Sequence, residues 1–214
     1  MTAAGKFITL EGGEGAGKST QANFLHQRLA AYGIKSLLTR EPGGSPRAEA
    51  IRAVLLSGKA KALGPMGEAL LFYAARDSHL ELTIRPALAR GQWVICDRFH
   101  DSTRAYQGAA GGVPIAVLDA LERIVIGATR PDLTLILDLP AEEGLKRASA
   151  RAKESGEAAD RFESMSLRFH ENLRREFQDI ATAEPERCVI IDASRPPEAV
   201  AEAIWAAVQQ RLDI

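Results

Sequence analysis

The 214-residue chain has few of the features that mark secreted or membrane-spanning proteins. It contains only two cysteines, Cys96 and Cys188, and both lie in apolar runs typical of buried strands. This pattern favours free thiols in a reducing compartment over a disulfide. No apolar run approaches the ~20 residues that a membrane-spanning helix needs, and Met1–Lys6 contains no hydrophobic signal region.

The chain also lacks a strong charge of either sign. Its formal net charge is −1, which argues against a general nucleic-acid or membrane-surface binder. Basic residues gathered around a small phosphorylated ligand remain compatible with this balance. We therefore expect a soluble, cytoplasmic protein with small-molecule ligands and without a nucleic-acid or membrane partner.

Hydrophobic residues make up 46% of the chain and charged residues 26%, which is ordinary for a globular protein with a sizeable core. Short, nearly continuous apolar runs alternate with helical patterns, as in parallel sheets that are buried on both faces. We therefore predict an α/β fold that forms one domain over residues 1–214. The expected strands are Lys6–Leu10, Ile34–Thr39, Trp93–Asp97, Leu133–Leu139 and Cys188–Asp192.

A glycine-rich segment between the first strand and the first helix fits the pattern GxxxxGK[ST] of a phosphate-binding loop. Its glycines let backbone N–H groups converge on one point, and the helix N-terminus adds positive potential. Lys18 is expected to reach the β- and γ-phosphates and Ser19 to bind Mg²⁺. An ordinary tight turn is the alternative. The predicted nucleotide-binding residues are Gly12, Gly13, Glu14, Gly15, Ala16, Gly17, Lys18, Ser19 and Thr20.

The third expected strand ends in Asp97 and Arg98 and leads into a dense polar stretch. An acidic residue at this point is typical of the strand that holds Mg²⁺ beside a phosphate loop, and Arg98 is suited to clamp a phosphate. A simple Asp–Arg pair that orders the loop is the alternative. Asp138 is a second acidic strand end, but it leads into Leu139-Pro140 and an ordinary helix, so we prefer Asp97 for the metal.

Two other segments carry open alternatives. The helix expected from about Met66 to Arg90 places Leu70 and Leu82 toward the core and Phe72 beside Arg76, where a ring and a guanidinium are suited to hold a flat base. Spacing alone favours a core Phe with a surface Arg. Residues of about 147–163 are highly charged and are expected to form a mobile lid or, equally, a solvated helical hairpin.

Three further motifs show a resemblance to a known family. Thr39–Gly44 (TREPGG), Asp97-Arg98 and Ser102–Gly108 (STRAYQG) together resemble the bacterial thymidylate kinases. The resemblance implies a P-loop kinase fold with strand order 2-3-1-4-5. It implies that a phosphoryl group is transferred in line from ATP to dTMP, with Mg²⁺ as the metal, for dTTP biosynthesis. It also implies a homodimer.

The resemblance also implies roles for single residues. Phe72 and Arg76 match the pair that stacks on and hydrogen-bonds thymine, which reverses the preference from spacing. Thr103 matches another thymine contact, Tyr106 the aromatic near the deoxyribose, and Arg40 the arginine that with Arg98 surrounds the dTMP phosphate. The remaining acceptor residues that we expect are Glu11, Ser102 and Gln107.

The phosphate loop contains no arginine, so the chain resembles family members that supply a basic catalytic residue from the lid. Arg151, Lys153 and Arg161 are the candidates. Two other functions remain as alternatives: a nucleotide or deoxynucleoside kinase of the same fold with another acceptor, and a non-catalytic P-loop switch. The NKxD motif of guanine-binding switches is absent from the sequence.

Overall fold

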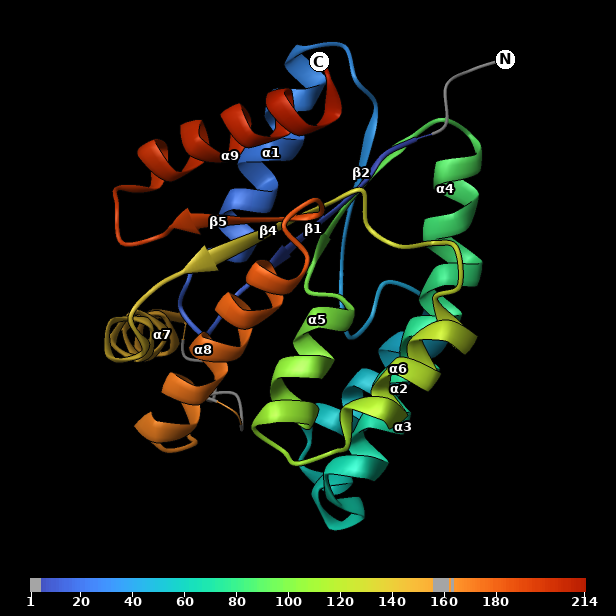
Figure 1. Ribbon diagram of the computed structural model, residues 1–214, viewed down its shortest axis with the longest axis vertical. Helices are drawn as coiled ribbons and strands as arrows, with labels where there is room; N and C mark the ends of the chain where they lie inside the picture. The colour runs from blue at the N-terminus through green and yellow to red at the C-terminus, as the bar shows by residue number, and fades with distance from the viewer. Residues whose placement is uncertain (1–4, 156–161, 163) are drawn as a thin grey trace.

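The computed structural model describes residues 5–155, 162 and 164–214. One sheet of five parallel strands has the order β2-β3-β1-β4-β5, which confirms the expected fold class and strand order. Figure 1 shows helices on both sides of this sheet. The strands are β1 (Phe7–Glu11), β2 (Ser36–Arg40), β3 (Trp93–Asp97), β4 (Leu133–Asp138) and β5 (Cys188–Asp192).

Helices connect each strand to the next. The α-helices are α1 (Lys18–Ala31), α2 (Pro46–Leu56), α3 (Gly64–His79), α4 (Arg85–Ala89), α5 (His100–Thr103), α6 (Ile115–Val125), α7 (Ala141–Ser155), α8 (Leu167–Ala183) and α9 (Pro197–Leu212). A 3₁₀ turn, η1 (Lys59–Leu63), precedes α3. Two π-helical turns, η2 (Leu80–Ile84) and η3 (Arg104–Ala109), extend α3 and α5.

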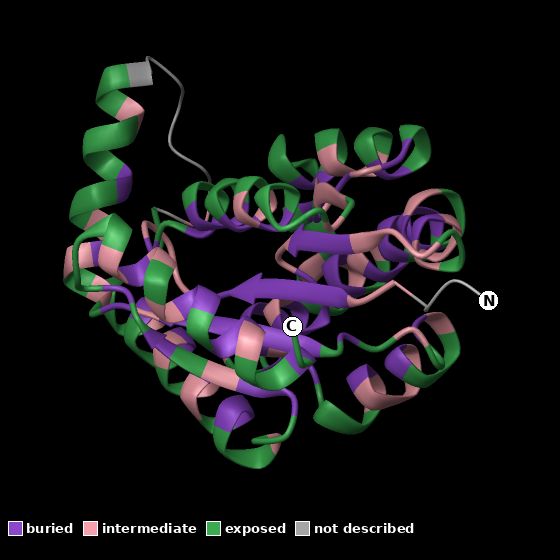
Figure 2. Cartoon of the chain, turned by 90° about the horizontal axis from the view of Figure 1, so that it is seen from above, coloured by how far each residue is buried: buried purple, intermediate pink, exposed green. Residues whose placement is uncertain are grey.

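Alternating side chains of the strands enter two different cores. Ile8 of β1 packs with α1 and α9 on one face, whereas the neighbouring Phe7 packs with α3 and α6 on the other. Ile136 of β4 faces α8, in a third cluster. Because both faces are covered, the three central strands β3, β1 and β4 are buried along most of their length (Figure 2) and read in sequence as continuous apolar runs, whereas the outer strands β2 and β5 are more exposed.

The parallel arrangement brings four polar strand ends to one edge of the sheet. Glu11, Arg40, Asp97 and Asp138 end β1, β2, β3 and β4, and Arg40 pairs in register with Asp97. Ligands of open α/β sheets bind outside the carboxyl ends of the strands. This edge is therefore where a site is expected. The motifs Thr39–Gly44 and Asp97-Arg98 each include a strand end there, and Ser102–Gly108 follows in α5 and η3.

The long helix predicted from Met66 to Arg90 differs in its burial. Leu70 and Leu82, expected in the core, are 50% and 52% exposed. The inward face instead carries Ala69, Tyr73 and Arg76, whose spacings of four and three residues follow one side of α3. The hydrophobic pattern indicated a helix correctly but assigned Leu70 to the wrong side of it.

The charged segment at 147–163 begins as regular structure. Residues 147–155 continue α7, while 156–161 and 163 lie outside the described residues, so the choice between a lid and a helical hairpin stays a prediction. Arg147 is committed to an ion pair with Glu143 and a 3.0 Å hydrogen bond to the Ala193 carbonyl. Cys96 and Cys188 are buried free thiols, as predicted. Within the described ranges, no helix is long and apolar enough to cross a bilayer.

Candidate functional site

The segment between β1 and α1 has the backbone that a phosphate loop requires. Gly12, Gly15 and Gly17 have φ angles of 133°, 67° and 87°, a region that side-chain-bearing residues rarely adopt. A Cβ atom on Gly12 would lie 2.4 Å from the Leu137 carbonyl oxygen, and one on Gly15 would lie 2.0 Å from that of Gly144. Gly12 and Gly15 are therefore favoured by both conformation and space, and Gly17 by conformation alone.

Lys18 lies in the centre of this loop. Its Nζ donates hydrogen bonds to the carbonyl oxygens of Gly12, at 3.1 Å, and of Gly13, at 2.7 Å. Burial, reinforced by the nearby charge of Arg98, lowers the pKa of Lys18 to about 8. Because this buried ammonium is bonded to neutral carbonyl oxygens, its interaction energy would become much more favourable when an anionic phosphate enters the loop.

The expected metal ligands lie together at the edge of the sheet. The Ser19 hydroxyl donates a short hydrogen bond to the Asp97 carboxylate. One hydroxyl and one carboxylate are a donor set suited to Mg²⁺, which takes its other ligands from water and nucleotide phosphates. Asp138 is committed elsewhere, because Arg174 donates to both of its carboxylate oxygens at 2.7 and 2.8 Å. This supports the preference for Asp97.

Arg98 joins the phosphate loop to the helix α5. It donates to the Gly12 carbonyl at 3.1 Å, to the Ser102 hydroxyl at 3.2 Å and to Glu14 at 2.9 Å. Tyr106 donates its hydroxyl to the same Glu14 oxygen at 2.6 Å. Although burial alone would raise it, Arg98 and Lys18 lower the pKa of Glu14 to about 2. Glu14 is thus a charged partner of Arg98.

Glu11 caps the start of α5. Its Oε1 accepts hydrogen bonds from the backbone N–H groups of Phe99, at 2.7 Å, and Ser102, at 3.2 Å, and its Oε2 accepts from the Ser102 hydroxyl at 2.6 Å. Burial and the nearby Asp101 raise the pKa of Glu11 to about 7. In this structure Glu11 therefore shapes the segment that carries the other predicted acceptor residues.

Arg76 is buried and held in a fixed orientation. Its Nε donates to Glu41 at 2.8 Å, and its Nη2 donates to the Phe99 carbonyl at 2.9 Å and the Thr103 hydroxyl at 3.2 Å. Its Nη1 is buried and has no hydrogen-bond partner among the residues that the structure describes. The expectation of a surface Arg from helical spacing alone is wrong, since only 1% of Arg76 is exposed. Phe72, one turn earlier, is half-buried.

The other predicted site residues are less closely gathered. Arg40 is exposed and lies 3.4 Å from Glu49, and Gln107 is buried in η3. Thr20 is exposed on the first turn of α1. Arg151 and Lys153 lie on the exposed surface of α7, which projects from the body of the molecule (Figure 2), and Arg161 lies outside the described residues.

Sequence reasoning missed two pairs of residues behind this site. Glu41 holds Arg76 and also contacts His79 Nδ1 at 3.0 Å. Its place in the Thr39–Gly44 motif was a signal that we did not use. Asp101 forms a buried pair with Arg187, 86 residues later in the chain, and no local pattern connects the two.

Comparison with known proteins agrees with this geometry. The family model for thymidylate kinase matches residues 10–204. Thymidylate kinases of Rhodopseudomonas palustris and a Bradyrhizobium species are each 58% identical to the chain over 97% of its length, and the matches cover 90% and 91% of those proteins. The crystal structure of thymidylate kinase from Ehrlichia chaffeensis superposes with a TM-score of 0.77 at 33% identity, over 96% of this chain and 100% of that one. The chain therefore belongs to the thymidylate kinase family.

Proposed function

We propose that the protein transfers the γ-phosphoryl group of ATP to dTMP and so produces ADP and dTDP for dTTP biosynthesis. The observation that carries the proposal is the position of Arg98, which contacts both the phosphate loop and the polar wall formed by α5 and η3. A single guanidinium at that junction is suited to bind an acceptor phosphate beside the donor phosphates.

The donor half of the site is the loop Gly12–Thr20. Its backbone N–H groups and Lys18 hold the phosphates of ATP. Ser19 and Asp97 would hold Mg²⁺, which supplies positive charge to these phosphates when it is bound. The close contact between the two side chains supports this assignment.

The acceptor half extends from Glu11 to α3. The buried Nη1 of Arg76 is an unused donor, and its N–H groups suit a carbonyl oxygen of thymine, with Phe72 stacked on the ring and Thr103 beside it. Tyr106 lies where the deoxyribose is expected, and Arg98 and Arg40 bind the phosphate. Glu11 and Ser102 complete this wall by holding the start of α5, and the buried Gln107 is its member in η3.

The chemistry requires no general base. An oxygen of the dTMP phosphate is already anionic and attacks the γ-phosphorus of ATP, while the bond from that phosphorus to the β,γ-bridging oxygen breaks. The bond electrons stay on ADP, whose developing charge Lys18 and the loop N–H groups stabilise. We assign the remaining charge stabilisation to a basic residue of α7 and the segment after it, with Arg151, Lys153 and Arg161 as candidates.

A panel of acceptors tests the proposed function. We expect ATP consumption in a coupled assay to be stimulated most by dTMP among dTMP, dUMP, dGMP, dCMP and AMP. Stronger stimulation by another acceptor would indicate a different kinase of the same fold. A protein that binds a partner in the presence of nucleotide, but releases no ADP with any acceptor, would be a P-loop switch.

Replacing Phe72 with alanine is expected to raise the dTMP dissociation constant about ten-fold, because stacking of a base on an aromatic ring is worth about 1–3 kcal/mol. Isothermal titration calorimetry measures the change. Phe72→Leu is the matched control, since it keeps the apolar volume and removes the ring. If the Leu variant binds dTMP like the wild type, Phe72 acts by packing and not by stacking.

We also propose that the protein is a cytoplasmic homodimer. Four apolar residues on or next to α3 share one exposed face at spacings of three and four residues: Leu63, Met66, Leu70 and Ala74. A second copy of the chain would cover this stripe. Light scattering is expected to give twice the 23.1 kDa mass of the chain, and Leu70→Glu is expected to reduce it to the single mass. A wild-type monomer at micromolar concentration would contradict this proposal.

A further inference from the structure

A buried ion pair lies behind the proposed acceptor site, outside the residues that would touch either substrate. Arg187, just before β5, donates from Nη1 and Nη2 to the two carboxylate oxygens of Asp101 on α5, at 2.8 and 2.9 Å. Asp101 is completely buried and Arg187 is 9% exposed. This two-point geometry fixes the orientation of α5 as well as its distance from the sheet.

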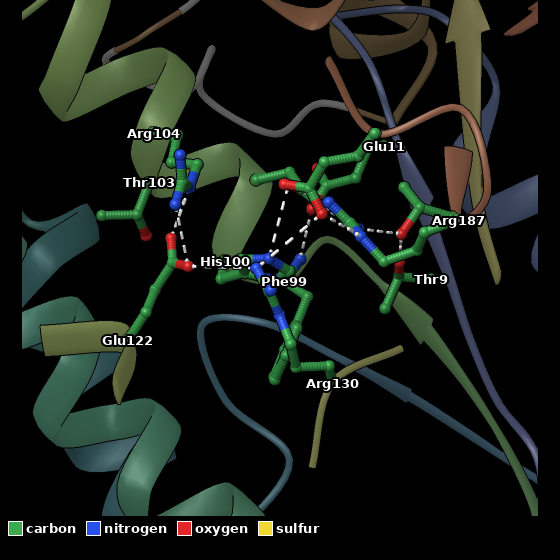
Figure 3. Close-up of polar contacts among 12 residues, drawn as sticks. Thr9, Glu11, Phe99, His100, Thr103, Arg104, Glu122, Arg130 and Arg187 are labelled. Carbon is green, nitrogen blue, oxygen red and sulfur yellow. Dashed lines mark hydrogen bonds and ion pairs between the residues drawn. The ribbon is translucent and has the colours of Figure 1, made fainter. Parts of the chain in front are cut away.

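The sheet side of the pair is also fixed. Arg187 Nη1 donates to the Thr134 hydroxyl of β4 at 2.5 Å, and Thr134 shares a 2.7 Å hydrogen bond with Thr9 of β1. Arg187 Nε donates to Glu184 at 3.0 Å. Figure 3 shows Arg187 and Thr9 on one side of His100 and Glu122 and Arg104 on the other. Arg187 is therefore a rigid connection between α5 and two central strands.

Asp101 is the first of three consecutive residues that each make a different contact. Ser102 binds Glu11 and Arg98, and Thr103 accepts from Arg76 at 3.2 Å. The short helix α5 continues directly into η3, and the contacts of these three residues attach it to β1, to α3 and to Arg187. Anything that fixes Asp101 also fixes the two side chains that meet the proposed phosphate- and base-binding arginines.

We infer that Arg187 and Asp101 are positioning residues for the acceptor: they hold α5 so that Ser102 and Thr103 keep Arg98 and Arg76 aligned for dTMP. The inference rests on the proposed function, since it assigns the pair to that acceptor site. Neither residue is expected to touch the nucleotide.

The electrostatics of the pair support this role. Burial alone would raise the pKa of Asp101, but His100 and the two hydrogen bonds from Arg187 outweigh it and lower that pKa. Despite burial, hydrogen bonds from Arg187 to Asp101 raise the pKa of the guanidinium. Both groups therefore stay charged, and removing one partner would leave an unpaired buried charge. A useful test therefore replaces both side chains of the pair.

The double variant Asp101→Leu with Arg187→Met replaces the pair with apolar side chains, a change that folded proteins often tolerate. We expect cooperative thermal unfolding, a KM for dTMP raised at least ten-fold and a KM for ATP within two-fold of the wild type. A general structural defect would lower activity toward both substrates together. A folded double variant with the wild-type KM for dTMP would overturn the inference.

Two further variants keep the test decisive if the double variant does not fold. Arg187→Lys retains the charge but loses the two-point contact, and Asp101→Asn retains the shape but loses the charge. Each is expected to raise the KM for dTMP several-fold, and an unchanged KM in both folded variants would contradict the role.

Arg28→Met is the matched control, because it removes an ion pair with Glu202 between α1 and α9, on the other face of the sheet. A wild-type protein without dTMP-dependent ADP release would instead refute the proposed function.

Discussion

Lys18→Ala is expected to reduce phosphoryl transfer at least a thousand-fold while leaving the fold intact. A thousand-fold loss corresponds to about 4 kcal/mol of transition-state stabilisation, which is reasonable for a desolvated charge beside the transferred group. Within the part of the chain that the structure describes, the Lys18 ammonium donates to the Gly12 and Gly13 carbonyls of its own loop. These bonds are replaceable by water, so the cost to stability should be small. A coupled ATP/dTMP assay and thermal unfolding measure the two effects.

Lys6→Ala is the matched control for this variant. Lys6 is exposed and paired with Asp132 at 3.5 Å, just before β1 and opposite the site edge. The Lys6→Ala variant should therefore retain wild-type turnover. Near-normal turnover of Lys18→Ala would refute the assignment of Lys18.

The lowered pKa of Lys18 predicts the alkaline limit of the same reaction. Below about pH 8 the ammonium is charged in the free enzyme, and above it the charge is lost. Since kcat/KM follows groups of the free enzyme, it should fall as the pH rises through 8. This fall should be absent from whatever activity remains in Lys18→Ala. A profile that stays flat to pH 10 in the wild type would contradict the pKa.

Local signals were enough to predict the backbone of the phosphate loop. The spacing of Gly12, Gly17 and Lys18 predicts one backbone conformation, because the φ angles of both glycines are ones that other residues rarely adopt, and a Cβ atom on Gly12 would also collide with β4. The five strands were recognisable because a strand buried on both faces is continuously apolar. The order of the strands in the sheet was predicted from the family resemblance, because the sequence of one strand does not show which other strands lie beside it.

The acceptor half depends on contacts between segments far apart in the chain. Helical spacing placed Arg76 on a surface, whereas Glu41, 35 residues earlier, makes its burial possible. Asp101 and Arg187 form an ion pair although 86 residues separate them in the chain, and neither residue belongs to one of the motifs identified in the sequence. Leu70 shows the opposite error, because an exposed leucine is expected in the core from a single sequence. Periodicity identifies a helix but not what covers each of its faces.

Arg98→Gly is the second change with a large expected effect. Because glycine suits the backbone conformation at position 98, this variant tests the guanidinium separately from the fold. Arg98 has a φ angle of 69°, a conformation that costs a side-chain-bearing residue about 1–3 kcal/mol and costs glycine little. Arg98 is retained here although glycine would fit better, which indicates that the guanidinium is needed. We expect at least a hundred-fold loss of kcat/KM for dTMP, measured by steady-state kinetics, with a melting temperature close to that of the wild type.

Comparison with two other variants separates the guanidinium from the backbone. Arg98→Ala should lose activity equally and also unfold at a lower temperature than Arg98→Gly, because alanine pays the strain without the contacts. Arg98→Lys should recover only part of the activity, since an ammonium cannot replace a planar fork that reaches Gly12, Glu14 and Ser102 together. Wild-type kcat/KM in Arg98→Gly would show that Arg98 only orders the loop after β3, the structural alternative for an Asp–Arg pair at a strand end.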